Sequence, residues 1–141
     1  MRLRIPNRLE DVFLALEQAD VALRRSRVAE ACCADVRLVL EELLVNTVRH
    51  GYPDGRDGYI DIDLEIRSDA VRLDLCDDAQ AFDPMLHEPP DLPGDLADRA
   101  IGGLGLHIAR SIADDLTYQR HERHNQVIVH FLITPSDEPA P

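Results

Sequence analysis

A carboxylate and an amide stand one helical turn apart inside an otherwise apolar run. Glu42 and Asn46 lie in the stretch 36–48, which reads VRLVLEELLVNTV. If this stretch is helical, both side chains fall on one stripe, about 40° apart around the axis. Two interpretations remain equally open. The pair could share a hydrogen bond on a partly wet face, or both groups could face a pocket, the amide oxygen toward a hard cation and the carboxylate toward a proton.

Two further patterns could bind a ligand, and each is ambiguous alone. Residues 102–106 read GGLGL at the start of an apolar-periodic stretch, where free backbone N–H groups at a helix N-terminus can receive an anion. A helix-start turn is at least as common an explanation. Residues 77–84 read DDAQAFDP just past an apolar strand. An acid there can accept a hydrogen bond from an exocyclic amine, although Asp is also common in turns.

Hydrophobic periodicity predicts the elements that would position these residues. The expected elements are a strand over 3–5, a helix capped by Asn7, a helix over 31–50 that stops at Gly51, a hairpin of 59–66 and 71–75, a helix over 104–115, and strands over 116–123 and 126–133 around a His124-Asn125 turn. Their order predicts an α+β fold, a two-layer α/β sandwich with three helices on one face of a mainly antiparallel mixed sheet.

One segment lacks clear periodicity. Residues 84–99 contain prolines 84, 89, 90 and 93, and a long ordered loop of this kind is typical of a functional lid, which we expect over 85–101. The chain has 141 residues, the size of one domain, which we assign to 1–135, with 136–141 as a frayed tail.

Composition excludes several classes of protein. The chain has 15 basic and 27 acidic residues, a net charge of −12, so neither direct nucleic-acid binding nor an anionic membrane surface is expected. All the basic residues are arginine, which excludes a P-loop NTPase, a eukaryotic-type protein kinase and Schiff-base chemistry. Neither a signal peptide nor a membrane-spanning apolar run is visible, and we expect a cytoplasmic protein with reduced cysteines.

Taken together in chain order, the three patterns resemble the boxes of the GHKL ATP-binding superfamily (Bergerat fold). Glu42 and Asn46 with His50-Gly51-Tyr52 resemble the N box, residues 77–84 the G1 box and residues 102–106 the G2 box. The stretch Glu42–Tyr52 and the Phe82-Asp83-Pro84 ending look like the bacterial anti-sigma-factor serine kinases, the group containing the Bacillus sporulation and stress-response anti-sigma factors. The resemblance extends over essentially the whole chain, from the first expected strand to the last.

The resemblance implies a role for each matching position. Glu42 would be the general base, Asn46 would supply an oxygen to Mg²⁺, and Asp77 would accept from the adenine amino group. The implied ATP-binding set is Asn46, His50, Asp77, Ala79, Gly103, Leu104, Gly105 and Leu106. In one departure, Ala79 replaces the glycine of the G1 box, where a methyl group could crowd the adenine or oppose a positive φ.

The implied function is an ATP-dependent protein serine/threonine kinase and anti-sigma-type regulator. Its substrate would be a serine on a small antagonist protein, and its regulatory partner a sigma factor or a similar protein. A homodimer is expected. The alternative is a catalytically silent, nucleotide-binding partner-switch module; retention of Glu42 favours the kinase.

Overall fold

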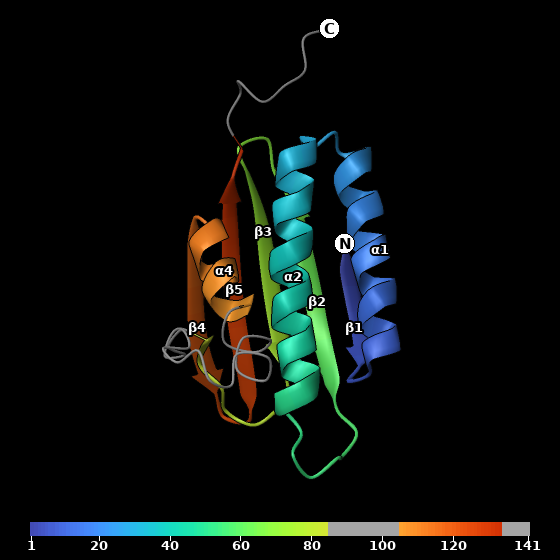
Figure 1. Cartoon of the computed structure of the whole chain (residues 1–141), viewed down its shortest axis with the longest axis vertical. Coiled ribbons are helices and arrows are strands. Elements are labelled where there is room, and N and C mark those ends of the chain that lie inside the picture. The colour runs from blue at the N-terminus through green and yellow to red at the C-terminus, as the bar shows by residue number, and fades with distance from the viewer. Residues whose placement is uncertain (85–104, 134–141) are drawn as a thin grey trace, which may run out of the picture.

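In the part of the chain that the structure describes, three helices cover one face of a five-stranded sheet, which gives the two layers visible in Figure 1. The computed structural model describes residues 1–84 and 105–133. The elements are β1 (Arg2–Pro6), α1 (Leu9–Arg25), α2 (Glu30–His50), β2 (Tyr59–Ile66), β3 (Ala70–Asp77), α4 (Gly105–Ile112), β4 (Asp115–His121) and β5 (His124–Leu132). The predicted α+β sandwich is confirmed.

The strand order is β1-β2-β3-β5-β4, and all four pairings are antiparallel, although the expectation had allowed a mixed sheet. The register places Asp77, the last residue of β3, opposite Ile60 on one side and Asn125 on the other. Strands β3 and β5 therefore bring an acid and an amide together at one end of the sheet.

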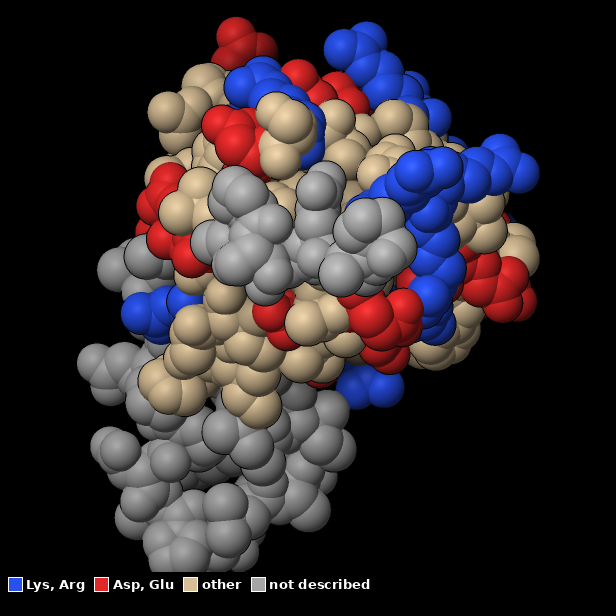
Figure 2. Space-filling view, turned by 90° about the horizontal axis from the view of Figure 1, so that it is seen from above, with Lys and Arg blue, Asp and Glu red and all other residues tan. Residues whose placement is uncertain are grey.

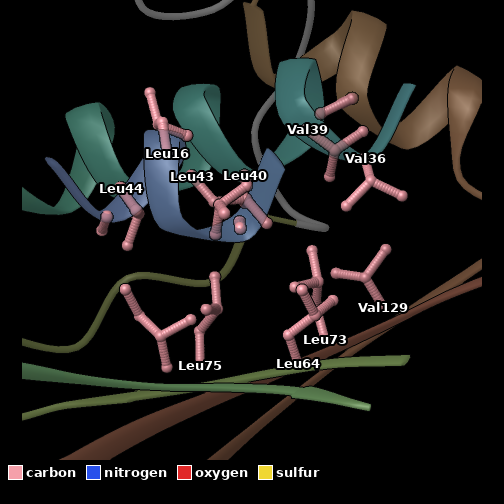
Figure 3. Packing of buried hydrophobic residues seen from close by; sticks show 14 of the residues in the cluster. Leu16, Val36, Val39, Leu40, Leu43, Leu44, Leu64, Leu73, Leu75 and Val129 are labelled. Atoms are coloured by element: carbon pink, nitrogen blue, oxygen red, sulfur yellow. The ribbon is translucent and has the colours of Figure 1, made fainter. Parts of the chain in front are cut away.

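The core lies between the helices and the sheet. Side chains of α1 and α2 point toward those of the strands in Figure 3, where Leu40 and Leu43 lie above Leu64 and Leu75. Each fully buried leucine contributes about 1.5–3 kcal/mol relative to an exposed one. This packing uses the apolar stripe of α2, and Glu42 and Asn46 lie beside that stripe, only half buried.

Charged residues dominate the sheet face that the helices leave open. Arg4 of β1 donates to both carboxylate oxygens of Asp61 on β2, at 2.7 and 2.9 Å. Seen from above, red and blue side chains are interspersed, and most of the blue lies on the side of α1 and β1 (Figure 2). No helix in the described parts of the chain is long and apolar enough to cross a bilayer.

Two local predictions were wrong. Asn7 does not cap α1, whose N-cap is Arg8 without a side-chain bond; Asn7 instead bonds the backbone of Arg56 and Gly58. The turn between β4 and β5 lies at residues 122–123, and Glu122 takes a φ of 54°. The predicted turn residue Asn125 belongs to β5, because its side chain has partners inside the sheet.

Candidate functional site

A pocket lies between the C-terminal half of α2, the N-terminal end of α4 and the sheet end where β3 stops. It is partly open to solvent. Its walls are mostly apolar and include Leu43, Ile60, Leu75, Leu106 and Val127. Its polar lining consists of Asn46, Thr47, His50, Asp77, Gln80 and Asn125. Apolar walls with a few polar groups are typical of a small-molecule site.

Asp77 is the buried acid of this pocket, with 5% of its surface exposed. Its Oδ1 accepts from Asn125 Nδ2 at 2.9 Å and from the Ala79 amide at 3.0 Å. Burial raises the pKa of Asp77, while these two hydrogen bonds oppose the shift. Among the described residues no hydrogen bond reaches Oδ2, so that oxygen remains available to a donor on a ligand.

The C-terminal end of α2 is hydrogen-bonded to the turn that follows Asp77. Gln80 donates from its side chain to the His50 carbonyl at 2.8 Å and from its amide to the Gly51 carbonyl at 2.9 Å. A Cβ on Gly51 would meet Thr47 O at 2.5 Å and Ala79 Cβ at 2.6 Å. Only glycine fits this contact, which holds the end of the helix that carries Glu42 and Asn46 against the segment 77–84.

Ala79 fits its position without backbone strain. Its φ is not positive, so the conformation that the family glycine would favour is not needed here. The residue is 2% exposed, its amide donates to Asp77, and its carbonyl accepts from Arg120 Nη1 at 2.9 Å. Its methyl group packs at Gly51.

Glu42 and Asn46 are both half buried, and no hydrogen bond among the described residues joins them. The first interpretation of this pair, a mutual hydrogen bond, is therefore wrong. Both line a groove between α1 and α2, together with Leu9, Phe13, Glu41, Val45, Arg49 and His50. Burial raises the pKa of Glu42, Glu41 adds to this shift, and Arg49 opposes it.

The pocket and the groove meet at Asn46 and His50, which line both. Glu42 stands one turn away on the groove side. A group held in the pocket near Asn46 can therefore lie close to a second molecule that enters the groove, an arrangement suited to transfer between two substrates.

Of the remaining predicted site residues, some lie in the described part of the chain and some lie outside it. Leu106 is buried and lines the pocket, and Gly105 begins α4, as expected for a helix N-terminus facing the site. Gly103, Leu104 and the predicted lid over 85–101 lie outside the described residues.

Sequence reasoning missed Asn125 and its partners on β4, Tyr118 and Arg120. Tyr118 OH donates to Asn125 Oδ1 at 2.6 Å, and Arg120 Nη1 donates to the same oxygen at 3.0 Å. A signal was present, because the alternation that places Val129 and Phe131 in the core extends back to Asn125.

The donor set fits a magnesium nucleotide. Asp77 offers an acceptor beside apolar walls, and Asn46 offers an amide oxygen, which is a ligand type that Mg²⁺ accepts. Within residues 1–84 and 105–133, no group of three or more His, Cys, Asp or Glu could hold a metal ion. A cation at Asn46 would therefore need oxygens from the nucleotide as well.

Comparison with known proteins identifies the family. Residues 5–131 match the histidine kinase-like ATPase domain. The chain belongs to this family. It is 29% identical over 119 residues to the serine-protein kinase RsbW of Listeria monocytogenes, which covers 81% of this chain and 75% of that protein. It is 32% identical over 103 residues to the serine/threonine-protein kinase BtrW of Bordetella bronchiseptica, covering 73% of this chain and 68% of that one.

A solved structure supports the same fold. The mycobacterial sensor histidine kinase MprB superimposes with a TM-score of 0.50 at 14% identity, over 92% of this chain and 97% of that chain. The predicted resemblance to the GHKL superfamily is thus confirmed, and the pocket described above lies within the matched residues of a nucleotide-binding family.

Proposed function

We propose that this protein is an ATP-dependent protein serine/threonine kinase of the anti-sigma type, which phosphorylates a serine on a small antagonist protein and binds a regulatory partner. One observation carries the proposal: Asn46 lies at the junction between a pocket with a buried acceptor, Asp77, and a groove lined by Glu42. The similarity to RsbW and BtrW supports the choice of a serine hydroxyl as acceptor.

Each residue has a distinct task in this proposal. Asp77 Oδ2 accepts from the adenine amino group, while apolar walls around Leu75 and Val127 cover the base. Asn46 holds Mg²⁺ through its amide oxygen. When bound, the metal neutralises phosphate charge, a task that the chain cannot give to lysine because it has none. Glu42 accepts the proton of the incoming hydroxyl.

Calorimetric titration tests the nucleotide half of the proposal. Asn46→Ala removes the metal ligand and leaves a strong helix former on α2. We expect the affinity for Mg-ATP to fall about 10- to 100-fold, since 1.4 kcal/mol corresponds to tenfold. Thr47→Ala is the matched control. Thr47 also lines the pocket, but its hydroxyl donates a hydrogen bond to the Leu43 carbonyl at 3.0 Å. Unchanged affinity in Asn46→Ala would contradict the assignment.

A transfer assay tests the kinase half. The protein is incubated with labelled ATP and with each small protein encoded beside its gene, and label on a serine is the expected result. Binding of ATP without transfer to any of these proteins would favour the silent partner-switch module instead.

A further inference from the structure

A hydrogen-bonded network behind Asp77 reaches from the pocket to the edge strand β4. At its centre Asn125 is 4% exposed. Its Nδ2 donates to Asp77 Oδ1 and to the Gln80 carbonyl, both at 2.9 Å. Its Oδ1 accepts from Tyr118 OH at 2.6 Å and from Arg120 Nη1 at 3.0 Å. Nδ2 also donates to the Ala79 carbonyl at 3.5 Å, so the side-chain amide has five partners from three segments.

These partners allow only one orientation of the amide. An ionised carboxylate and a carbonyl can only accept, and a guanidinium can only donate. A flipped amide would face the Asn125 oxygen toward Asp77 and the NH₂ group toward Arg120, leaving buried groups without complementary partners. Each such mismatch costs about 1–3 kcal/mol. Asp77, the Gln80 carbonyl and Arg120 therefore determine the orientation of the Asn125 amide, and Tyr118 adds a further hydrogen bond to its oxygen.

The orientation of Asn125 decides what Asp77 offers to the pocket. Because Asn125 Nδ2 and the Ala79 amide both bond Oδ1, they hold the carboxylate in one rotamer and leave Oδ2 to a ligand. Arg120 stabilises the same geometry, since its Nη1 also donates to the Ala79 carbonyl at 2.9 Å.

We propose that Tyr118 and Arg120 are positioning residues for base recognition: through the Asn125 amide they fix Asp77 as a pure acceptor that selects a base with an exocyclic amine. The inference deepens the proposed function and rests on it. A carboxylate oxygen accepts from the 6-amino group of adenine and repels the 6-oxo group of guanine. A site built around such a hydrogen bond discriminates strongly against the wrong partner.

The test compares Mg-ATP with Mg-GTP by calorimetry. Tyr118→Phe removes one donor to Asn125 and keeps the ring. We expect the ratio of ATP to GTP affinity to fall about three- to tenfold, as the loss of one net hydrogen bond predicts. Tyr59→Phe is the matched control, because Tyr59 OH bonds His124 Nε2 at 2.9 Å outside this network. The control should keep the parental ratio.

A second variant tests the same network at an exposed residue, where a substitution is less able to disturb folding. Arg120 is exposed, so Arg120→Gln should leave the fold intact while weakening the hold on Asn125 and on the Ala79 carbonyl. We expect its ATP to GTP ratio to fall as in Tyr118→Phe. Thermal unfolding of each variant measures any change in stability separately from the nucleotide preference.

The outcomes are distinguishable. If the parent prefers ATP and both variants keep the parental ratio, whatever happens to their melting temperature, the network is only structural and the inference is wrong. If the parent binds neither nucleotide, the proposed function fails, and the inference fails with it. A parent that binds ATP and GTP equally would leave nucleotide binding intact but overturn the role given to Asp77 and its network.

Discussion

Glu42 lies in the groove beside two charged neighbours that act on it in opposite directions. Burial raises its pKa above the ordinary value near 4.5, Glu41 raises it further, and Arg49 lowers it. A general base works only when ionised, and the ionised fraction falls as pH drops through the pKa. The rate of phosphoryl transfer should fall as the pH is lowered, and this fall (the acid limb of the rate profile) should lie at a higher pH than an ordinary glutamate would give.

We expect Glu42→Gln to retain Mg-ATP binding and to slow transfer by about 10²- to 10⁴-fold, the usual contribution of general-base catalysis. The residual rate of the Glu42→Gln variant should also no longer fall over the pH range in which Glu42 titrates in the parent. Glu41→Gln is the matched control, since it removes the neighbouring charge; it should stay active and move the limb to lower pH. Rates against pH under single-turnover conditions measure both effects. A normal rate in Glu42→Gln would show that another group accepts the proton.

Single residues also show where sequence reasoning ended. The spacing of Glu42 and Asn46 placed them on one helix stripe, and the sequence placed Asp77 at a strand end, because both conclusions depend on local geometry. That Asp77 is buried and not an ordinary turn acid is known only from the structure. Whether Ala79 was strained could not be decided from the sequence. The answer depends on its φ angle in the fold and on Gly51, 28 positions earlier, whose missing Cβ makes room for the methyl group.

At the scale of elements, local periodicity predicted α2 and the β2–β3 hairpin within a few residues. It failed at the β4–β5 turn, where Asn125 is the residue of the run His121–Asn125 that most favours a turn. The turn forms at residues 122–123 because Asn125, as a residue of β5, makes hydrogen bonds to three segments. The alternation that extends back to Asn125 indicated the strand, but its partners on other segments could not be identified from a single sequence. The predicted lid and Gly103 remain predictions.

The connection between α2 and β2 is anchored by Asp78. Its Oδ1 accepts from Tyr52 OH at 2.7 Å and from the Tyr59 amide at 3.0 Å, and Arg56 pairs with its Oδ2 at 3.3 Å. Burial alone would raise the pKa of Asp78, but these partners outweigh it and hold the pKa below the ordinary 3.8. A carboxyl with a depressed folded pKa stabilises the fold above its unfolded pKa, and this stability is lost as pH falls through the folded pKa.

We expect Asp78→Asn to lower the free energy of unfolding at pH 7 by about 1–3 kcal/mol, because it weakens hydrogen bonds to a charged acceptor. The difference from the parent should shrink as pH falls from about 4 toward and below the depressed pKa of Asp78, where the parental carboxylate becomes protonated. Urea unfolding at several pH values measures this. Asp54→Asn, in the same connection, is the control and should change little. A deficit of equal size at pH 7 and pH 2 would contradict the electrostatic role.

At the scale of the whole molecule, α1 stands at the edge of the helix layer, with only α2 beside it (Figure 1). Its outer surface exposes several large apolar side chains. Phe13 is 51% exposed, Leu14 56% and Val21 47%. The edge strand β1 beneath it carries arginines and ends in Pro6, which opposes sheet-to-sheet pairing. Self-association, if it follows this side of the molecule, should therefore use the helix and not the strand edge.

Two opposing terms set the strength of that association. Burial of α1 side chains favours it, whereas two copies that each carry a net charge of −12 repel one another. Because salt screens charges over about 10 Å at 0.1 M, dimers should become tighter as salt rises. Leu14→Ser should weaken them about tenfold or more, since removing a buried leucine costs roughly 1.5–3 kcal/mol. Leu132→Ser, at an even more exposed apolar position on β5, should not weaken them. Sedimentation equilibrium at two salt concentrations measures all three proteins, and a parent that stays monomeric at high micromolar concentration in both would exclude the dimer.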